Sequence, residues 1–158
     1  DLALVHSDGN DLAVLEDTGV YAELQRLKQE GLIRAFGFSG KTVAGGLQAL
    51  EQGDCAMVTY NLAEQGEKPV LDYAANHGKG ILIKKALGSG HACRPAQQVG
   101  QATPRDACRH SEDPVRASFE LIFAHPAVSS VIVGTITPAH LAHNVATAAA
   151  LLQARQFA

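Results

Sequence analysis

The sequence predicts an α/β fold built on a parallel sheet, and three of its features support this prediction. Five short apolar runs alternate with longer segments in which apolar residues recur at the spacing of a helix face. The runs are continuously apolar rather than alternating, which is typical of parallel strands that are covered on both faces. Strand and helix alternate in order, so consecutive strands are expected to be joined by right-handed crossovers.

The five expected strands are bounded by turn signals. Ser7-Asp8-Gly9-Asn10 follows the first strand, Ser39-Gly40 stops the second, and Gln52-Gly53-Asp54 precedes the third. In chain order the strands are expected at residues 2–5, 33–38, 55–60, 81–83 and 129–133.

Each expected helix has an apolar face, and most have recognisable end signals. Gly31 follows the first helix at the C-cap, and Pro69 suits the first turn of the third. Asp113-Pro114 places an N-cap before the fourth helix, and Thr137-Pro138 caps the last. The residues expected to face inward are Val20, Leu24 and Leu27, then Val43, Leu47 and Leu50, then Val70, Tyr73, Ala74 and His77, then Val115, Phe119, Ile122 and Phe123, and finally Leu141, Val145, Ala148 and Leu152.

Two architectures are consistent with five units of this kind. They can form an open doubly wound sheet, or five-eighths of a (β/α)8 TIM barrel. The chain begins inside an expected strand without an initiator Met, which favours the partial barrel and suggests that an N-terminal portion is missing.

Composition excludes several classes of function. The net charge of −3 offers no basic field for nucleic acid, and no apolar run approaches the roughly 18 residues of a membrane helix. No signal peptide is visible, and three cysteines are too few for a disulfide scaffold. We therefore expect a cytoplasmic protein without a nucleic-acid or membrane partner.

Polar side chains gather where the expected strands end, and in parallel α/β proteins this edge of the sheet carries the functional site. His6 follows the first strand, where its imidazole can donate a hydrogen bond to a substrate carbonyl or act as an acid or base. It can equally be a histidine whose hydrogen bonds are satisfied at the start of a loop. Lys84 ends the fourth strand and either faces the site or belongs to a solvated pair with Lys85.

Two glycine-containing segments are candidates for phosphate binding. Leu87-Gly88-Ser89-Gly90 follows a strand, and its backbone N–H groups can approach a phosphate. Gly134-Thr135-Ile136-Thr137-Pro138 runs from a strand into a capped helix, whose amino end suits an anion. Either segment can also be an ordinary turn.

The polar loop from Gly90 to Glu112 contains His91-x-Cys93 and Cys108-x-His110. These four side chains can in principle hold zinc, and the two cysteines can form a disulfide. The spacing matches no familiar zinc finger, so scattered residues on an insertion are the expected interpretation, and we predict no metal site.

Taken together, six segments in this order resemble the aldo-keto reductases. Any one of them is a weak signal, but together they cover the chain from Leu2 to about Ala150. The segments are Leu4-Val5-His6, residues 31–39 (G-x-I-R-x-x-G-x-S), residues 58–62 (V-x-Y-N-L), residues 86–90 (the tail of S-P-L-G-S-G), Phe123-Ala124-His125-Pro126 with residues 131–134 (L-x-H-P and V-I-P-G), and Thr137-Pro138 with Asn144.

The resemblance implies strands 4 to 8 of a (β/α)8 TIM barrel, with residues 1–158 forming the C-terminal part of one domain and residues 91–112 a polar loop insertion. It implies hydride transfer from NADP(H) or NAD(H) to a small aldehyde or ketone, with His6 orienting the carbonyl. Ser39 and Gly40 would lie at the nicotinamide carboxamide and Lys84 at the nicotinamide ring. The remaining implied contacts are Leu87, Gly88, Ser89 and Gly90 at the pyrophosphate, and Gly134, Thr135, His140 and Asn144 at the adenosine end.

The chain departs from the family pattern at several positions. Gly40 replaces an asparagine, Met57 a glutamine, and Lys84 the tyrosine that stacks on the nicotinamide. An ammonium group cannot stack, so either the ring is held differently or Lys84 meets a phosphate. Gly134 and His140 replace the basic residues expected for the 2′-phosphate of NADPH, so the preference between NADPH and NADH stays open.

The tyrosine, lysine and aspartate that complete the family's catalytic site belong to strands with no counterpart here. None of the three tyrosines of this chain, Tyr21, Tyr60 and Tyr73, is at a position that matches the family's proton-donor tyrosine. We therefore expect these 158 residues to be inactive unless the missing half of the barrel completes them. With two sheet edges and an uncovered inner face, the piece alone should self-associate, aggregate or stay partly molten.

Three functions follow from these observations. The first is an NAD(P)H-dependent carbonyl reductase seen in part. The second is a non-catalytic nucleotide-binding or regulatory relative, and the third is a metal-binding module on the loop from His91 to His110.

Overall fold

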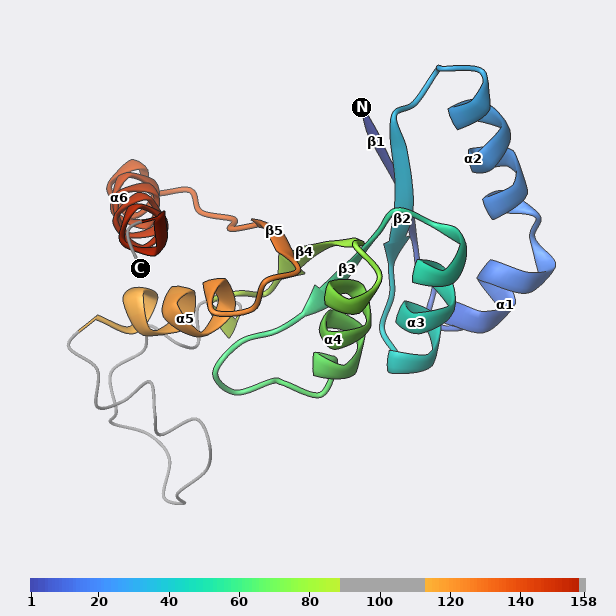
Figure 1. Cartoon of the computed structure of the whole chain (residues 1–158). Coiled ribbons are helices and arrows are strands. Elements are labelled where there is room, and N and C mark those ends of the chain that lie inside the picture. Colours follow the sequence, from blue (N-terminus) through green and yellow to red (C-terminus); the bar gives the residue numbers. More distant parts are fainter. Residues whose placement is uncertain (89–112, 157–158) are drawn as a thin grey trace.

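The computed structural model describes residues 1–88 and 113–156 (Figure 1). It has an α/β fold. The elements are β1 (Leu2–His6), α1 (Asp11–Asp17), α2 (Val20–Gln29), β2 (Ala35–Ser39), α3 (Val43–Gln52), β3 (Cys55–Thr59), α4 (Lys68–Asn76), β4 (Gly80–Lys84), α5 (Pro114–Phe123), β5 (Val128–Val131) and α6 (Pro138–Gln156).

The five strands form one parallel sheet in the order β1-β2-β3-β4-β5, so each strand pairs with the next along the chain. A doubly wound sheet reverses its strand order at a switch point. The described residues contain no such reversal. Sequential order is instead that of neighbouring strands in a barrel.

The helices cover one face of the sheet. Figure 1 shows α1, α2 and α3 on one side of β1 and β2. In β3 and β4 the side chains that pack against helices are fully buried, among them Val58, Ile81 and Ile83. Those between them, such as Met57 and Leu82, are only half-buried. The strands were expected to be covered on both faces, but in this part of the chain helices cover only one face of β3 and β4.

The bounds of the five strands differ from the expected ones by one or two residues, and one helix was not expected. The second strand begins at Ala35 rather than Ile33, and the N–H groups of Arg34 and Ala35 both donate to the carbonyl of Asp1 at 3.0 Å. The segment expected to be only a turn and connection contains α1, whose seven residues are too few for helical periodicity to stand out.

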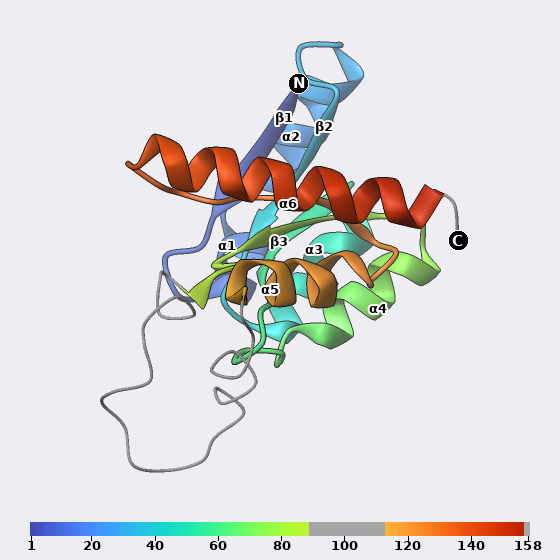
Figure 2. The same ribbon diagram turned by 90° about the vertical axis from the view of Figure 1, so that its left-hand side faces the viewer.

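The expected inner face of the last helix is wrong for most of its members. Leu141, Val145 and Leu152 are 51%, 60% and 45% exposed, whereas Asn144 and Thr147 are buried. The helix α6 lies beside α5 (Figure 2). Small and apolar residues occur all around α6, so periodicity alone could not identify the face that packs.

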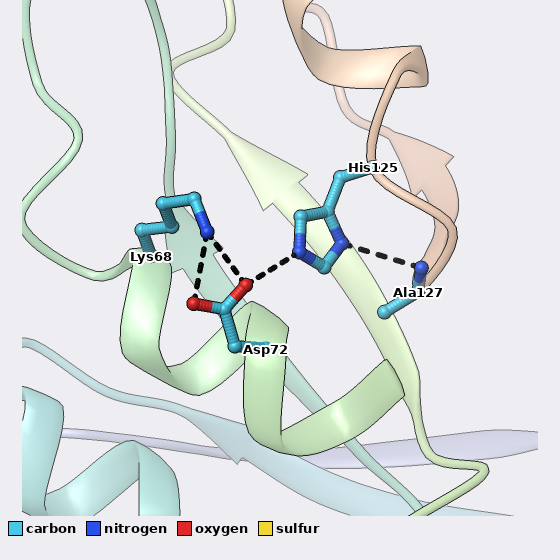
Figure 3. A network of polar contacts seen from close by, with 4 residues as sticks. All are labelled: Lys68, Asp72, His125 and Ala127. Atoms are coloured by element: carbon cyan, nitrogen blue, oxygen red, sulfur yellow. Dashed lines mark hydrogen bonds and ion pairs between the residues drawn. The ribbon is translucent and has the colours of Figure 1, made fainter. Parts of the chain in front are cut away.

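A polar network at the start of β5 joins α4 to the turn after α5 (Figure 3). The carboxylate of Asp72 accepts from the Lys68 ammonium at 2.7 and 2.9 Å, and its Oδ1 lies 3.1 Å from His125 Nε2. The backbone N–H of Ala127 donates to His125 Nδ1 at 3.3 Å. His125 therefore carries its proton on Nε2 and links the two elements.

None of the helices in residues 1–88 and 113–156 has both the length and the apolar character needed to cross a membrane.

Candidate functional site

The carboxyl ends of β1, β2 and β4 bring four of the predicted residues together. His6 is exposed and pairs in register with Ser39, which is 5% exposed. From the end of β4, Lys84 Nζ donates to the Gly40 carbonyl at 2.5 Å and to Ser39 Oγ at 3.3 Å. We call His6, Ser39, Gly40 and Lys84 the strand-end cluster.

Lys84 lies among charged groups. Burial lowers the pKa of its ammonium group, the carboxylates of Glu67 and Asp11 oppose this shift, and Lys85 adds to it. Burial likewise raises the pKa of Glu67, whose carboxylate accepts a hydrogen bond from the backbone N–H of Thr59. The strand-end cluster thus contains a half-buried ammonium group whose pKa is lowered by burial, and nearby carboxylates oppose part of this shift.

Asp11, at the start of α1, supports the loop that follows β2. Its Oδ2 accepts from the N–H groups of Lys41 and Thr42 and from the Thr42 hydroxyl, each at 2.8 Å, and its Oδ1 accepts from Ser7. Burial opposes ionisation, but these hydrogen bonds hold the pKa of the Asp11 carboxyl below its ordinary value. Sequence reasoning missed Asp11 because its partners Lys41 and Thr42 lie about thirty positions away along the chain.

Gly40 fits its surroundings closely. A Cβ at this position would lie 3.0 Å from Asp11 Oδ2 and 3.1 Å from Phe38 Cδ1. The asparagine that the family pattern has here would therefore require Asp11 or Phe38 to shift. In this chain, Gly40 contributes its carbonyl oxygen to Lys84 instead.

A second group of predicted residues lines a cavity of about 890 Å³ between the carboxyl ends of β4 and β5 and the starts of α5 and α6. Five predicted residues are among those lining it, namely Leu87, Gly134, Thr135, His140 and Asn144. Three further polar residues that were not predicted as contacts also line it, namely Lys85, Asp113 and His143. We call this space the β4–β5 cavity.

The β4–β5 cavity has features that suit an anion. It is bordered by the first turn of α6, where the positive end of the helix dipole lies. No heavy atom lies within 4 Å of a Cβ built at Gly134, so a ligand can approach that backbone closely. At the start of α5 the Asp113 carboxylate accepts from the N–H groups of Val115 and Arg116 and lies 3.3 Å from His143 Nε2. We infer that the α6 side is the better anion site, because the α5 end already has a carboxylate.

The glycine-containing loop that follows β4 is described as far as Gly88. Gly88 has a φ of 55° and donates its N–H to the Lys85 carbonyl at 2.8 Å. Ser89 and Gly90 lie outside the described residues, as do the His91, Cys93, Cys108 and His110 of the zinc and disulfide hypotheses. In residues 1–88 and 113–156 no group of three His, Cys, Asp or Glu side chains is arranged to hold a metal ion.

Comparison with known proteins identifies the family. The sequence model of the Aldo/keto reductase family matches residues 1–158. The chain belongs to the aldo-keto reductase family. Aldo-keto reductases are oxidoreductases that use NAD(P)H and act on small carbonyl substrates. No curated protein matches the chain.

Solved structures of other family members resemble this chain. The proposed aldo-keto reductase PA4992 from Pseudomonas aeruginosa is 58% identical, with a TM-score of 0.78 over 96% of this chain and 52% of that one. The holo form of AKR11C1 from Bacillus halodurans is 19% identical, with a TM-score of 0.72 over 93% and 52% of the two chains. An aldo/keto reductase from Klebsiella pneumoniae in complex with NADP and acetate is 20% identical, with a TM-score of 0.64 over 94% and 53%. The chain spans about half the length of these relatives.

The tyrosines of this chain do not offer an exposed phenol at a strand end. Tyr21 and Tyr60 are each 4% exposed and belong to the hydrophobic core, and Tyr73 stacks on His77 with ring centroids 3.9 Å apart. Burial raises the pKa of Tyr21. Of the residues in the strand-end cluster, His6 is therefore the one that was predicted to be catalytic, and no tyrosine accompanies it there.

Proposed function

We propose that the protein carrying this aldo-keto reductase chain reduces an aldehyde or ketone to an alcohol with NADPH or NADH. The observation that carries the proposal is the gathering of five predicted cofactor contacts around the β4–β5 cavity, beside the strand-end cluster. Both groups lie at the carboxyl ends of parallel strands, where this kind of fold binds ligands.

The residues present fit a nicotinamide dinucleotide. Gly134, Thr135, His140 and Asn144 would hold its adenosine end in the β4–β5 cavity. The segment from Leu87 through Gly88, Ser89 and Gly90 would lie along the pyrophosphate. Ser39, Gly40 and Lys84 would hold its nicotinamide end. When bound, the cofactor supplies the hydride.

His6 would position the substrate. It lies beside Ser39 in the sheet and is exposed, so its imidazole is available to donate a hydrogen bond to the carbonyl oxygen of a small aldehyde or ketone. This contact would orient the carbonyl carbon toward the nicotinamide end of the cofactor.

We further propose that β1 to β5 are strands 4 to 8 of a (β/α)8 TIM barrel. The sequential strand order and the half-buried second face of β3 and β4 support this arrangement. The other half would supply the tyrosine, lysine and aspartate, so the 158 residues alone should not reduce carbonyls. The low cysteine content supports a cytoplasmic location.

Two preparations test the proposal. The full-length protein should bind NADPH or NADH, measured by quenching of protein or cofactor fluorescence, and should oxidise the cofactor when p-nitrobenzaldehyde is added. A preparation of the 158 residues alone should give no turnover. A full-length protein that binds neither cofactor would refute the proposal, and turnover by the short chain would refute the need for the missing half.

A non-catalytic nucleotide-binding or regulatory relative is the second candidate. The close fit of Gly40 against Asp11 and Phe38, and the ammonium of Lys84 where the family has a tyrosine, favour it. Full-length protein that binds NADPH but reduces none of a panel of aldehydes and ketones would support this alternative.

A further inference from the structure

Lys85 has an unusual backbone conformation. Its φ is 54°, and it is the only residue other than glycine with a positive φ in residues 1–88 and 113–156. Side chains with a Cβ rarely adopt this left-handed region, and such strain persists only where the surroundings impose it.

Asn61 is the side chain that holds this conformation. Its Nδ2 donates to the Lys85 carbonyl at 2.9 Å, and the N–H of Gly88 donates to the same oxygen at 2.8 Å. Asn61 is itself fixed, because its Oδ1 accepts from the N–H groups of Ala63 and Glu64 at 2.9 Å each. It is 3% exposed, so these hydrogen bonds form away from solvent.

Lys85 borders the β4–β5 cavity, which is also lined by residues of α6 that include His140 and His143. It is exposed, and within the described residues no ion pair joins it to a carboxylate. Its neighbour Lys84 is different, because two of its N–H groups are occupied by Gly40 and Ser39. Of the two adjacent lysines, Lys85 therefore has the ammonium group that is available to a ligand in the cavity.

We propose that Lys85 binds a phosphate group of the dinucleotide in the β4–β5 cavity and that Asn61 is a positioning residue that maintains the left-handed backbone of Lys85 for this contact. The inference rests on the proposed cofactor function of the cavity. An ammonium group is a good partner for a phosphate as a point charge, and the positive end of α6 adds to its field.

The charge is tested in the full-length protein with ADP and NADPH as probes. Lys85→Met should raise the Kd of both by about tenfold, the loss expected for one charge-assisted contact. It should also reduce the dependence of Kd on salt concentration, whereas Lys85→Arg should retain both the affinity and the salt dependence. Lys28→Met is the matched control, because it removes a cation that pairs with Asp54 at the opposite edge of the sheet.

The positioning role is tested with Asn61→Asp, which keeps the acceptor for Ala63 and Glu64 but lacks the donor to Lys85. It should weaken ADP binding about as much as Lys85→Met. In a Lys85→Gly background the same substitution should have no further effect on Kd, because there is no ammonium group left to position and glycine adopts positive φ without support. Lys85→Gly should also melt at a higher temperature than Lys85→Met, since it relieves the strained backbone.

The outcomes separate this inference from the function on which it rests. Wild-type protein that binds neither NADPH nor NADH would overturn both. Wild-type binding with unchanged ADP affinity in Lys85→Met would overturn the phosphate contact alone. Unchanged affinity in a folded Asn61→Asp would overturn the positioning role. If that variant does not fold, a melting temperature of Lys85→Gly at or below that of Lys85→Met would do the same.

Discussion

The ammonium group of Lys84 lies 2.5 Å from the carbonyl oxygen of Gly40, so a side chain at the end of β4 holds the loop that follows β2. The two strands are not neighbours, because β3 lies between them. This one contact therefore spans three strands at the edge of the sheet where the candidate site lies.

Lys84→Met should loosen this edge. The Gly40 carbonyl would lose a charged donor, and we expect the free energy of unfolding to fall by about 1.5 kcal/mol. Urea denaturation of the full-length protein measures the change. Lys84→Arg, which keeps a cationic donor, should lose less, and equal losses in the two variants would contradict the assigned hydrogen bond.

Asp11→Asn should destabilise the protein in a pH-dependent manner. Asparagine cannot accept all the hydrogen bonds from Ser7, Lys41 and Thr42, and the expected loss near neutral pH is about 2 kcal/mol.

The pH dependence follows from the lowered pKa of Asp11 in the folded protein. The ionised carboxyl stabilises the fold above its ordinary pKa, and this contribution is lost as the pH falls through the lower folded value. Melting curves of wild type and Asp11→Asn should thus converge toward acid pH. A constant difference between pH 7 and pH 3 would count against the role of the charge.

Gly37→Ala tests the close approach of β2 and β3. A Cβ at Gly37 would lie 2.1 Å from the Cys55 carbonyl oxygen and 2.6 Å from its sulfur, so the strands would have to move apart. We expect a loss of roughly 3 kcal/mol or more, measured by chemical unfolding. Gly66→Ala is the control, because no heavy atom lies within 4 Å of its added Cβ, and its stability should be nearly unchanged.

His125→Phe tests the network that joins α4 to the turn before β5 (Figure 3). The ring volume is kept, but the hydrogen bonds to Asp72 and from Ala127 are lost, so the melting temperature should fall by a few degrees. Lys68→Met removes only the exposed ion pair to Asp72 and should change it little. A larger effect from Lys68→Met than from His125→Phe would show that the histidine is not the link.

His140→Arg tests the adenosine end of the proposed cofactor site. An arginine bordering the β4–β5 cavity would supply a permanent, bidentate partner for the 2′-phosphate, so the ratio of NADH to NADPH dissociation constants should rise about tenfold. Fluorescence titrations of the full-length protein with both cofactors give this ratio. His140→Gln should not raise it, and an unchanged ratio in His140→Arg would place the 2′-phosphate elsewhere.

Much of the fold could be predicted from local signals. Asp113-Pro114 marked the start of α5, and the structure confirms it because Asp113 caps the N–H groups of Val115 and Arg116. The strand β4 was predicted to within one residue at each end. By contrast, the prediction of the packed face of α6 was wrong, because apolar residues occur on all sides of this helix. Asn144 and Thr147 are buried because of how α6 packs against α5.

The candidate site was predicted in part. His6, Ser39 and Lys84 were expected at strand ends, and the parallel register places His6 beside Ser39. Asn61 and Lys85 also follow strands but were assigned no role, and Asp11 was not identified, because their importance depends on partners remote in sequence or on a backbone angle.

By itself, the sequence determined the alternation of strands and helices, the polar strand ends and the resemblance to the aldo-keto reductases, because caps, periodicity and motifs are properties of short segments. Only the tertiary structure decided the strand order, the β4–β5 cavity and the hydrogen bond from Lys84 to the Gly40 carbonyl. It alone also revealed the left-handed Lys85. These features arise from contacts between residues far apart along the chain, whose free energies depend on packing and burial that no local pattern specifies.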